Sequence, residues 1–276
     1  MDIRFETSQK EVAAMETDGL RKQFLCEELI RPGSVNMVYS HYDRMIVGGL
    51  RASVQPLSLE PDPELRATYF LERRELGIIN VGGKGFVEAG QEKFLLDKMS
   101  CCYLGKGTRT VRFFSESAAD PAIFYFLSAP AHAEYPARLM KKDEASPVNL
   151  GSPQTSNERT IYKYIHAEGI QSCQLVMGLT MLASGSVWNS IPPHTHTRRM
   201  EVYFYFDLPG DQRVFHFMGE PQQTRHLVMS NHQAVISPPW SIHCGCGTTN
   251  YGFIWGMAGE NQTFTDMDAA PVAALK

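Results

Sequence analysis

The sequence predicts a mainly β protein made of two similar β domains, with short helices at its N-terminus. After Pro32-Gly33, short runs rich in Val, Ile, Phe and Tyr alternate with Gly, Pro and Asn, a pattern typical of many antiparallel strands. One extended polar stretch, RLMKKDEASPVNLGSPQTSN at 138–157, divides the chain near its middle. Segments of the first half also align with segments of the second. We therefore expect one domain in residues 1–140 and another in residues 141–276.

The N-terminal segment predicts two short helices. Ser8 and Glu11 fit a capping box, in which a serine hydroxyl and a glutamate carboxylate satisfy the free amides of a first helical turn. A helix to about Thr17 should follow. Asp18-Gly19 should end this helix, and residues 20–29 should form a second one.

The alignment of the two halves predicts an internal duplication. FLERRELGIINV (70–81) lies over HTRRMEVYFYFD (196–207) with Glu75 on Glu201, a lag of 126 residues. FLLDKMSCCYL (94–104) falls on HLVMSNHQAVI (226–236) at a lag of 132, and FYFLSAPA (124–131) falls on FIWGMAGE (253–260) at 129. Loop insertions between matched strands would produce this drift. Because identities are few, chance similarity between two β-rich sequences is the alternative.

Composition excludes several classes of partner. The chain has 26 Lys and Arg against 30 Asp and Glu, and it has no long basic run, so nucleic acid is not an expected partner. It has no apolar stretch long enough for a membrane span, and its start lacks the pattern of a secretory signal, so we expect a cytoplasmic protein without a membrane partner. The six cysteines form no disulfide framework, and most of them should be buried thiols.

The stretch IPPHTHTRRMEVYFYFDL (191–208) carries the first sign of chemistry. Residues two apart share a face only in extended chain, so His194 and His196 converge only if this segment is a strand. The two prolines at 192–193 oppose a helix, and the β-branched and aromatic run 202–206 favours a strand. Glu201 would point to the opposite face of a regular strand, but a bend within 197–200 would bring it back.

A further ligand is expected from SPPWSIHCGCG (237–247), where His243 follows a Pro-Pro turn. Three imidazoles and one carboxylate suit Zn, Fe, Mn, Ni or Co and leave open positions for water or substrate. The alternative is that His194, His196 and His243 are structural or surface histidines, as we expect for the six others. Cys244 and Cys246 flank this turn and should be packing thiols.

The first half lacks this constellation. Counting back from Glu75 by the spacings of the second half places Thr68 and Phe70 where His194 and His196 stand. Val111 falls at the position of His243. If the two halves share a fold, only the C-terminal half binds metal.

These residues resemble the cupin superfamily. The His-Thr-His pair and the glutamate five residues later match the first cupin motif, His-X-His followed by three or four residues and Glu. Pro238 and His243 match the second motif, Pro-X-Gly-X-X-His, with Trp240 in place of its glycine. The resemblance implies two jelly-roll barrels (a bicupin), in which an N-terminal barrel without metal ligands precedes a C-terminal metal-binding barrel.

A closer resemblance, over the whole length, is to the 5-keto-4-deoxyuronate isomerase family, also called 4-deoxy-L-threo-5-hexosulose-uronate ketol-isomerases, of pectin breakdown. PPHTHTRRMEVYFYFDLP, SPPWSIHCG, FIWGMAGENQ and GKGTRTVRFFS carry it. It implies a homohexamer that interconverts 5-dehydro-4-deoxy-D-glucuronate and 3-deoxy-D-glycero-2,5-hexodiulosonate. It also implies one Zn²⁺ per subunit, held by His194, His196, Glu201 and His243.

For the carboxylate of such a substrate, Arg199 is the first candidate, because a guanidinium suits a carboxylate and Arg199 shares a strand face with Glu201. A surface or interdomain ion pair is its alternative role, and Arg159 and Lys163 are further candidates. The sequence indicates no general acid or base. Two other functions remain open: an iron-dependent cupin dioxygenase and a non-catalytic sugar-binding or storage bicupin.

Overall fold

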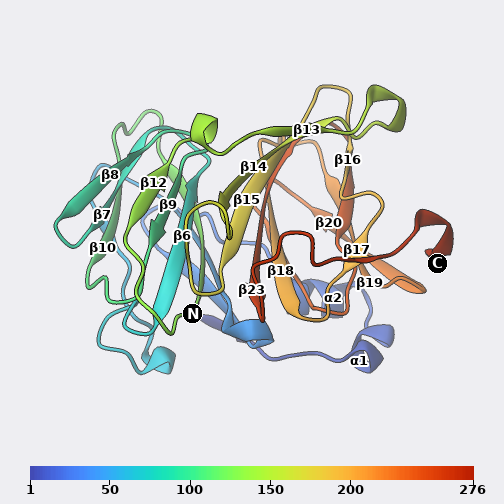
Figure 1. Cartoon of the computed structure of the whole chain (residues 1–276), viewed down its shortest axis with the longest axis horizontal. Helices are drawn as coiled ribbons and strands as arrows, with labels where there is room; N and C mark the ends of the chain where they lie inside the picture. The colour runs from blue at the N-terminus through green and yellow to red at the C-terminus, as the bar shows by residue number, and fades with distance from the viewer.

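The computed structural model describes residues 1–276 as two β halves that lie side by side (Figure 1). The first half contains a seven-stranded sheet and a four-stranded sheet. In sheet order, the seven strands are β1 (Asp2–Arg4), β3 (Asn36–Ser40), β4 (Ile46–Arg51), β11 (Ile123–Pro130), β6 (Arg74–Asn80), β9 (Cys101–Leu104) and β12 (Arg138–Met140). The four strands are β5 (Leu57–Ser58), β10 (Val111–Ser115), β7 (Gly85–Ala89) and β8 (Glu92–Leu96).

The second half contains sheets of the same two sizes, and its central strands follow an equivalent order. Its seven-stranded sheet has the order β13 (Val148–Leu150), β14 (Arg159–Ile165), β15 (Val176–Leu182), β23 (Gly252–Gly259), β18 (Arg199–Phe206), β21 (Ala234–Ser237) and β2 (Leu25–Cys26). Its four-stranded sheet has the order β16 (Trp188–Asn189), β22 (Cys244–Gly247), β19 (Val214–Glu220) and β20 (Gln223–Met229), and β17 (His194–Thr195) pairs with β24 (Asp268–Ala269). The mainly β, jelly-roll fold expected from the sequence is confirmed.

The two large sheets pack against each other through their outer faces. Tyr125 of β11 stacks on Phe204 of β18 with ring centroids 4.2 Å apart. Close approach requires glycine on both sides: a Cβ on Gly256 would lie 2.1 Å from the Leu127 side chain, and one on Gly77 would lie 2.7 Å from Ile165. The opposite face of each large sheet lines the interior of its own barrel.

The N-terminal segment follows the sequence expectation only in part. The capping box of Ser8 and Glu11 is present at helix α1 (Gln9–Ala13). Helix α2 (Thr17–Phe24) contains Gly19, so the expected break at Asp18-Gly19 is wrong, and the helix ends at Phe24 instead of residue 29. It ends there because the next two residues form β2, which pairs with β21 of the second half. Local propensity could not show this pairing, since its partner lies far along the chain.

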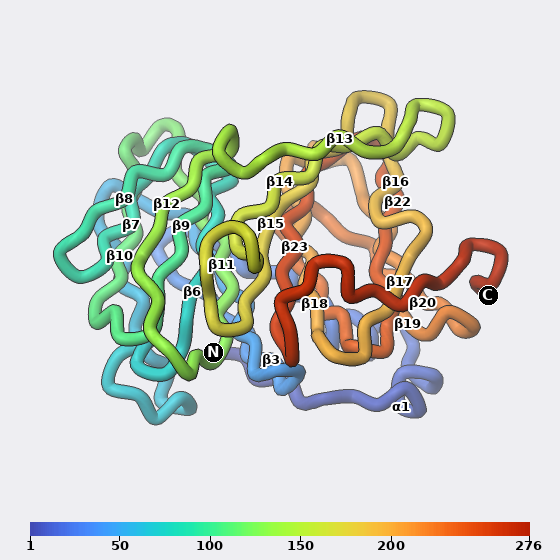
Figure 2. The backbone as a smooth tube through the Cα atoms, in the orientation of Figure 1, coloured from blue at the N-terminus to red at the C-terminus, as the bar shows by residue number.

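Residues 1–30 therefore cross from one half to the other. The tube in Figure 2 shows the blue N-terminal chain running beneath the orange and red half. Buried Leu20 and Phe24 of α2 belong to the core of that half. No helix of the protein is long and apolar enough to span a membrane.

The predicted alignment of Glu75 with Glu201 is wrong by one residue. Glu201 pairs with Met257, whereas in the first half it is Leu76 that pairs with Ser128, the residue aligned with Met257. Leu76 also pairs with the last residue of β9, as Glu201 pairs with the last residue of β21. Because successive strand residues face opposite sides, Glu75 points out of its barrel while Glu201 points into its own. The halves therefore match at a lag of 125 here.

Glu75 is an interdomain anchor. Its carboxylate is fully buried and accepts hydrogen bonds from the backbone N–H groups of Cys173 (2.7 Å), Gln174 (2.9 Å) and Leu175 (2.8 Å). The hydroxyl of Tyr103 donates a fourth at 2.8 Å. A buried carboxylate with this many donors holds the 173–175 segment of the second half against the first.

Candidate metal centre

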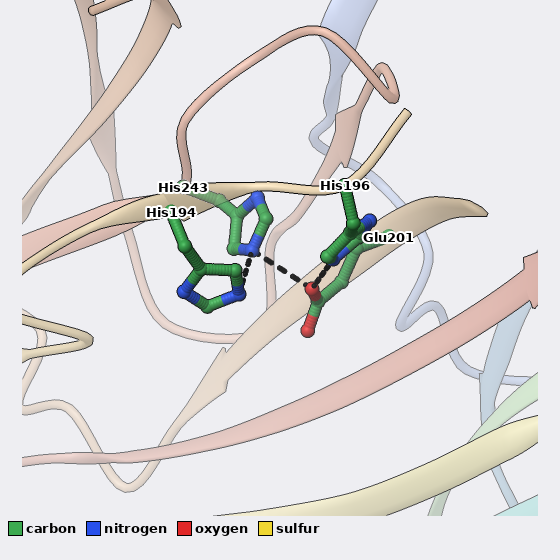
Figure 3. A group of neighbouring side chains, drawn as sticks. All are labelled: His194, His196, Glu201 and His243. Atoms are coloured by element: carbon green, nitrogen blue, oxygen red, sulfur yellow. Dashed lines mark hydrogen bonds and ion pairs between the residues drawn. The ribbon is translucent and has the colours of Figure 1, made fainter. Parts of the chain in front are cut away.

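Four side chains converge inside the second barrel: His194, His196, Glu201 and His243 (Figure 3). His194 lies in β17, and Glu201 lies in β18. Between them, residues 197–198 form a turn, and the N–H of Arg199 donates to the carbonyl of His196 at 3.1 Å. This turn is the bend that the odd spacing of Glu201 requires.

The fourth side chain comes from a distant segment. His243 immediately precedes β22 of the four-stranded sheet, and its Nε2 atom lies 2.9 Å from Glu201 Oε2 and 2.9 Å from His194 Nε2. His196 Nε2 lies 2.9 Å from the same carboxylate oxygen. One potential ligand atom from each of the four residues lies within 4.8 Å of every other. The structure thus brings together all four residues proposed as ligands.

The electrostatics of this cluster favour a cation. Burial alone would raise the pKa of Glu201, but His243 and His196 together hold this pKa well below its ordinary value, so the carboxylate is ionised. Burial and the neighbouring His243 lower the pKa of His194 to about 3, so its imidazole is neutral and has a free lone pair. Three imidazole nitrogens and a carboxylate oxygen that face one point form a donor set for Zn or another of the divalent metals considered above.

Two of the imidazole rings are oriented by contacts at the nitrogen that faces away from the cluster, Nδ1. His196 Nδ1 donates to the carbonyl of Arg199 at 2.8 Å, and His243 Nδ1 lies 3.3 Å from Ser237 Oγ. A hydrogen bond at Nδ1 turns Nε2 toward the shared point and selects the tautomer that can bind a metal.

A cavity of about 300 Å³ opens onto this cluster. Ile161, Phe253, Trp255 and Met257 supply apolar walls. Polar groups lie at a few places only, as in pockets for small polar ligands. They are Arg159, Thr180, Ser190, Arg199 and Tyr203, beside His194 and Glu201.

The structure changes the roles considered for the arginines. Arg199 lines the cavity, but it is fully buried, and its Nη1 and Nη2 donate to the carbonyls of Thr263 (2.8 Å) and Asp266 (2.9 Å). Arg159 donates only to the carbonyl of Asn157, at 2.9 Å, and burial lowers its pKa. Lys163 lies over the Phe264 ring and does not line the cavity. Arg159 therefore has more free donors for a substrate than Arg199.

Tyr203 and Ser190 are site residues that the sequence reasoning missed. Their hydroxyls lie 2.8 Å apart in the cavity, and burial raises the pKa of Tyr203 far above its ordinary value, so the phenol stays protonated. The sequence did contain a signal for Tyr203, because in a strand Tyr203 shares the face of Glu201.

His216, expected to be structural, is buried and forms a hydrogen bond with the Tyr205 hydroxyl at 2.8 Å, while its Nε2 has no partner.

Comparison with known proteins adds a family and several relatives. Residues 24–272 match the model of the KduI/IolB family. The chain is 56% identical over 276 residues to a 4-deoxy-L-threo-5-hexosulose-uronate ketol-isomerase of Halalkalibacterium halodurans, and each chain is covered fully. It is 52% identical, also with full coverage of both chains, to a protein of the same name from Caldicellulosiruptor bescii.

Among solved structures, an IolB-like protein from Salmonella typhimurium superposes with a TM-score of 0.70 at 17% identity, covering 87% of this chain and 94% of the other. Oxalate decarboxylase of Bacillus subtilis superposes with a TM-score of 0.55 at 8% identity, covering 80% and 70%. At these identities the likeness concerns the fold.

Proposed function

The chain belongs to the KduI/IolB family, and from this premise we propose that it is a metal-dependent ketol-isomerase that converts 5-dehydro-4-deoxy-D-glucuronate to 3-deoxy-D-glycero-2,5-hexodiulosonate. Its full-length relatives are named as enzymes of this kind, and the chain is an enzyme. The observation that carries the proposal is the cluster of His194, His196, Glu201 and His243 at the end of a cavity of suitable size. The relatives' names favour an isomerase over a dioxygenase or a binding protein.

We propose that these four residues hold Zn²⁺, and that residues 141–276, completed by α2 and β2, form the metal-binding domain while the rest of residues 1–140 forms a domain without metal ligands. When bound, the metal supplies Lewis acidity that stabilises the negative charge developing on the substrate oxygens during enolisation. The donor set supports a divalent cation of the zinc type.

Around the cation, the chain's own residues bind and orient the substrate. Arg159 is placed to pair with the substrate carboxylate, since most of its donors are free and a charged hydrogen bond is strong at a half-buried site. Tyr203, which stays protonated, donates a hydrogen bond to a substrate oxygen. Arg199 holds the 263–266 loop over the cavity through hydrogen bonds to two carbonyls. Its positive charge adds to the attraction of the cavity for an anionic substrate.

The test is conversion followed by NMR. Wild-type protein incubated with the unsaturated-uronate breakdown product should form the diketo acid, and His243→Ala should lose both bound metal and conversion. His226→Ala, an exposed histidine outside the cluster, is the matched control and should keep both. No conversion by wild type, or unchanged conversion by a His243→Ala protein shown to lack metal, refutes the proposal.

The role of Arg159 has its own measurement. Arg159→Gln should raise KM by roughly tenfold or more and leave the metal content unchanged, because it removes a charged partner of the substrate and no ligand. Lys163→Gln is the control.

We also propose a homohexamer, on the resemblance alone, and light scattering coupled to size-exclusion chromatography would test it.

A further inference from the structure

The first barrel has a cavity of its own, at the place that corresponds to the metal cavity of the second. It measures about 480 Å³. Arg74 of β6 lines it, as Arg199 of the equivalent strand β18 lines the other. Ile3 of β1 and Tyr39 of β3 correspond to the lining residues Leu150 of β13 and Arg159 of β14 in strand order. The duplication has therefore kept a pocket in the half that lacks metal ligands.

The charge of this pocket is strongly one-sided. Arg44, Arg73 and Arg74 line it together with His41, whereas Glu64 is its one carboxylate. None of the three arginines forms an ion pair with a carboxylate of the protein. Three unneutralised guanidinium groups around one cavity create a field that attracts an anion.

Arg74 is built into this cavity and keeps a free donor group. Its side chain is held by Ser128, whose hydroxyl accepts from Nε at 3.0 Å and whose carbonyl accepts from Nη2 at 2.7 Å. Its Nη2 also donates to the carbonyl of Arg44. Only 7% of the residue is exposed, and Nη1 has no hydrogen-bond partner in the protein.

The equivalent arginine of the second half has both terminal nitrogens bonded within the protein, and only its Nε lacks a hydrogen-bond partner. Arg199 spends both terminal nitrogens on carbonyls and has Asp266 4.0 Å from its Nε. A buried guanidinium without a carboxylate nearby is costly unless a ligand or water completes it. Arg74 thus has the position of Arg199, but no carboxylate of the protein forms an ion pair with it, and one of its terminal nitrogens, Nη1, has no hydrogen-bond partner in the protein.

We propose that this first-barrel cavity binds a small organic acid of sugar size through a carboxylate or phosphate group. Arg74 would hold the oxyanion from the floor of the cavity, and the exposed Arg44 and Arg73 would hold it from the rim. Tyr39, Phe70 and Ile3 supply apolar walls for the carbon skeleton. The cavity has no metal-ligand set, so it lacks the chemistry proposed for the second barrel.

Isothermal titration of the metal-loaded, full-length protein at low ionic strength tests this proposal, with glucuronate and inorganic phosphate as separate probes. We expect a binding event that the Arg44→Gln/Arg73→Gln double variant weakens by about tenfold or more. The control Arg112→Gln/Arg138→Gln removes two exposed arginines outside the cavity and should bind as wild type does. The control variant and the test variant each remove two positive charges. The control therefore shows whether a change in net charge is enough to weaken binding.

The His243→Ala variant separates this cavity from the metal cavity, because it should retain the binding event. Binding of phosphate but not of glucuronate would show that the cavity accepts a phosphate group, and binding of glucuronate would show that it accepts a carboxylate carried by a sugar. The proposal is overturned if neither probe binds, if Arg44→Gln/Arg73→Gln binds as tightly as wild type, or if His243→Ala abolishes the event. Equal melting temperatures of the variants would show that folding does not explain a loss.

Discussion

Glu75 and Glu201 occupy neighbouring positions in equivalent strands of the two barrels, yet they do opposite things. Glu201 points into its barrel and shares one oxygen with two histidines at 2.9 Å. Glu75 points out of its barrel and is saturated by three backbone N–H groups and a tyrosine hydroxyl. A displacement of one residue along a strand therefore separates a carboxylate that can bind a metal from one that joins two domains.

The same displacement places Leu76 at the position of Glu201. Leu76 is fully buried in the apolar core of the first barrel. The first barrel thus lacks the glutamate as well as the histidines at this position, and its interior is filled by packing. Each barrel has a cavity, but only the cavity of the second barrel adjoins a set of potential metal ligands.

The largest expected effect comes from Glu201→Gln. An amide is a poor metal ligand, and its NH₂ group would face the imidazole nitrogens, so bound metal should be lost and turnover should fall by roughly 100-fold or more. Metal analysis and the NMR assay measure both quantities, with far-UV circular dichroism as the check on folding. Full activity with normal metal content would contradict the role assigned to Glu201.

Glu75→Gln should act on stability and not on metal. Its NH₂ group would face the backbone donors of 173–175, and the loss of charged hydrogen bonds should lower the free energy of unfolding by about 3 kcal/mol. Urea unfolding measures this change. If Glu75→Gln lost metal while its stability stayed unchanged, the two glutamates would not have the separate roles that the register gives them.

Tyr103→Phe tests the same anchor more gently. It removes one of four donors to Glu75 and leaves the three backbone N–H groups in place. The free energy of unfolding should fall by about 1 kcal/mol, again without loss of metal. A larger loss than that of Glu75→Gln would show that Tyr103 stabilises the interface by some route other than this hydrogen bond.

The smallest effect concerns the loop beside the metal cavity. Arg198 and Asn261 donate to Asp266 and hold the pKa of its carboxyl well below the ordinary value. The ionised form therefore stabilises the fold above about pH 4, and this contribution is lost as the pH falls toward the folded-state pKa. Asp266→Asn should cost less than about 1 kcal/mol at pH 7 and still less at pH 3.

Urea unfolding at the two pH values measures this difference, with the exposed Asp211→Asn as the control. A cost for Asp266→Asn that grew on acidification would reverse the expected sign.

Much of the fold could be predicted from local signals. The capping box at Ser8 and the strand-rich composition after residue 33 were sufficient for the short first helix and the fold class. The bend before Glu201 followed from side-chain alternation. The end of α2 could not be predicted, because β2 is defined by a partner strand more than 200 residues away.

The metal ligands could be predicted from the sequence, but the strand register and the roles of the arginines could not. Ligand spacing within one short segment of chain is a local property, so the convergence of His194, His196 and Glu201 could be expected. The alignment on Glu75 failed because matching letters in two strands does not reveal a shift of one residue, and only pairing with β11 and β23 does. The balance between Arg199 and Arg159 depends on which carbonyls lie near each guanidinium, which no sequence pattern shows.

The pairing of β2 with β21 also orders events during synthesis. Leu25 and Cys26 leave the ribosome early, but their partners Val235 and Ala234 are made about 200 residues later, a wait of roughly 10 to 40 s at ordinary elongation rates. Until β21 is made, β2 has no partner strand, and the apolar face of α2 has no core to pack against. The second barrel is thus completed by a segment that is translated about 200 residues before its partner strand, so this edge of the sheet can form only after β21 has been made.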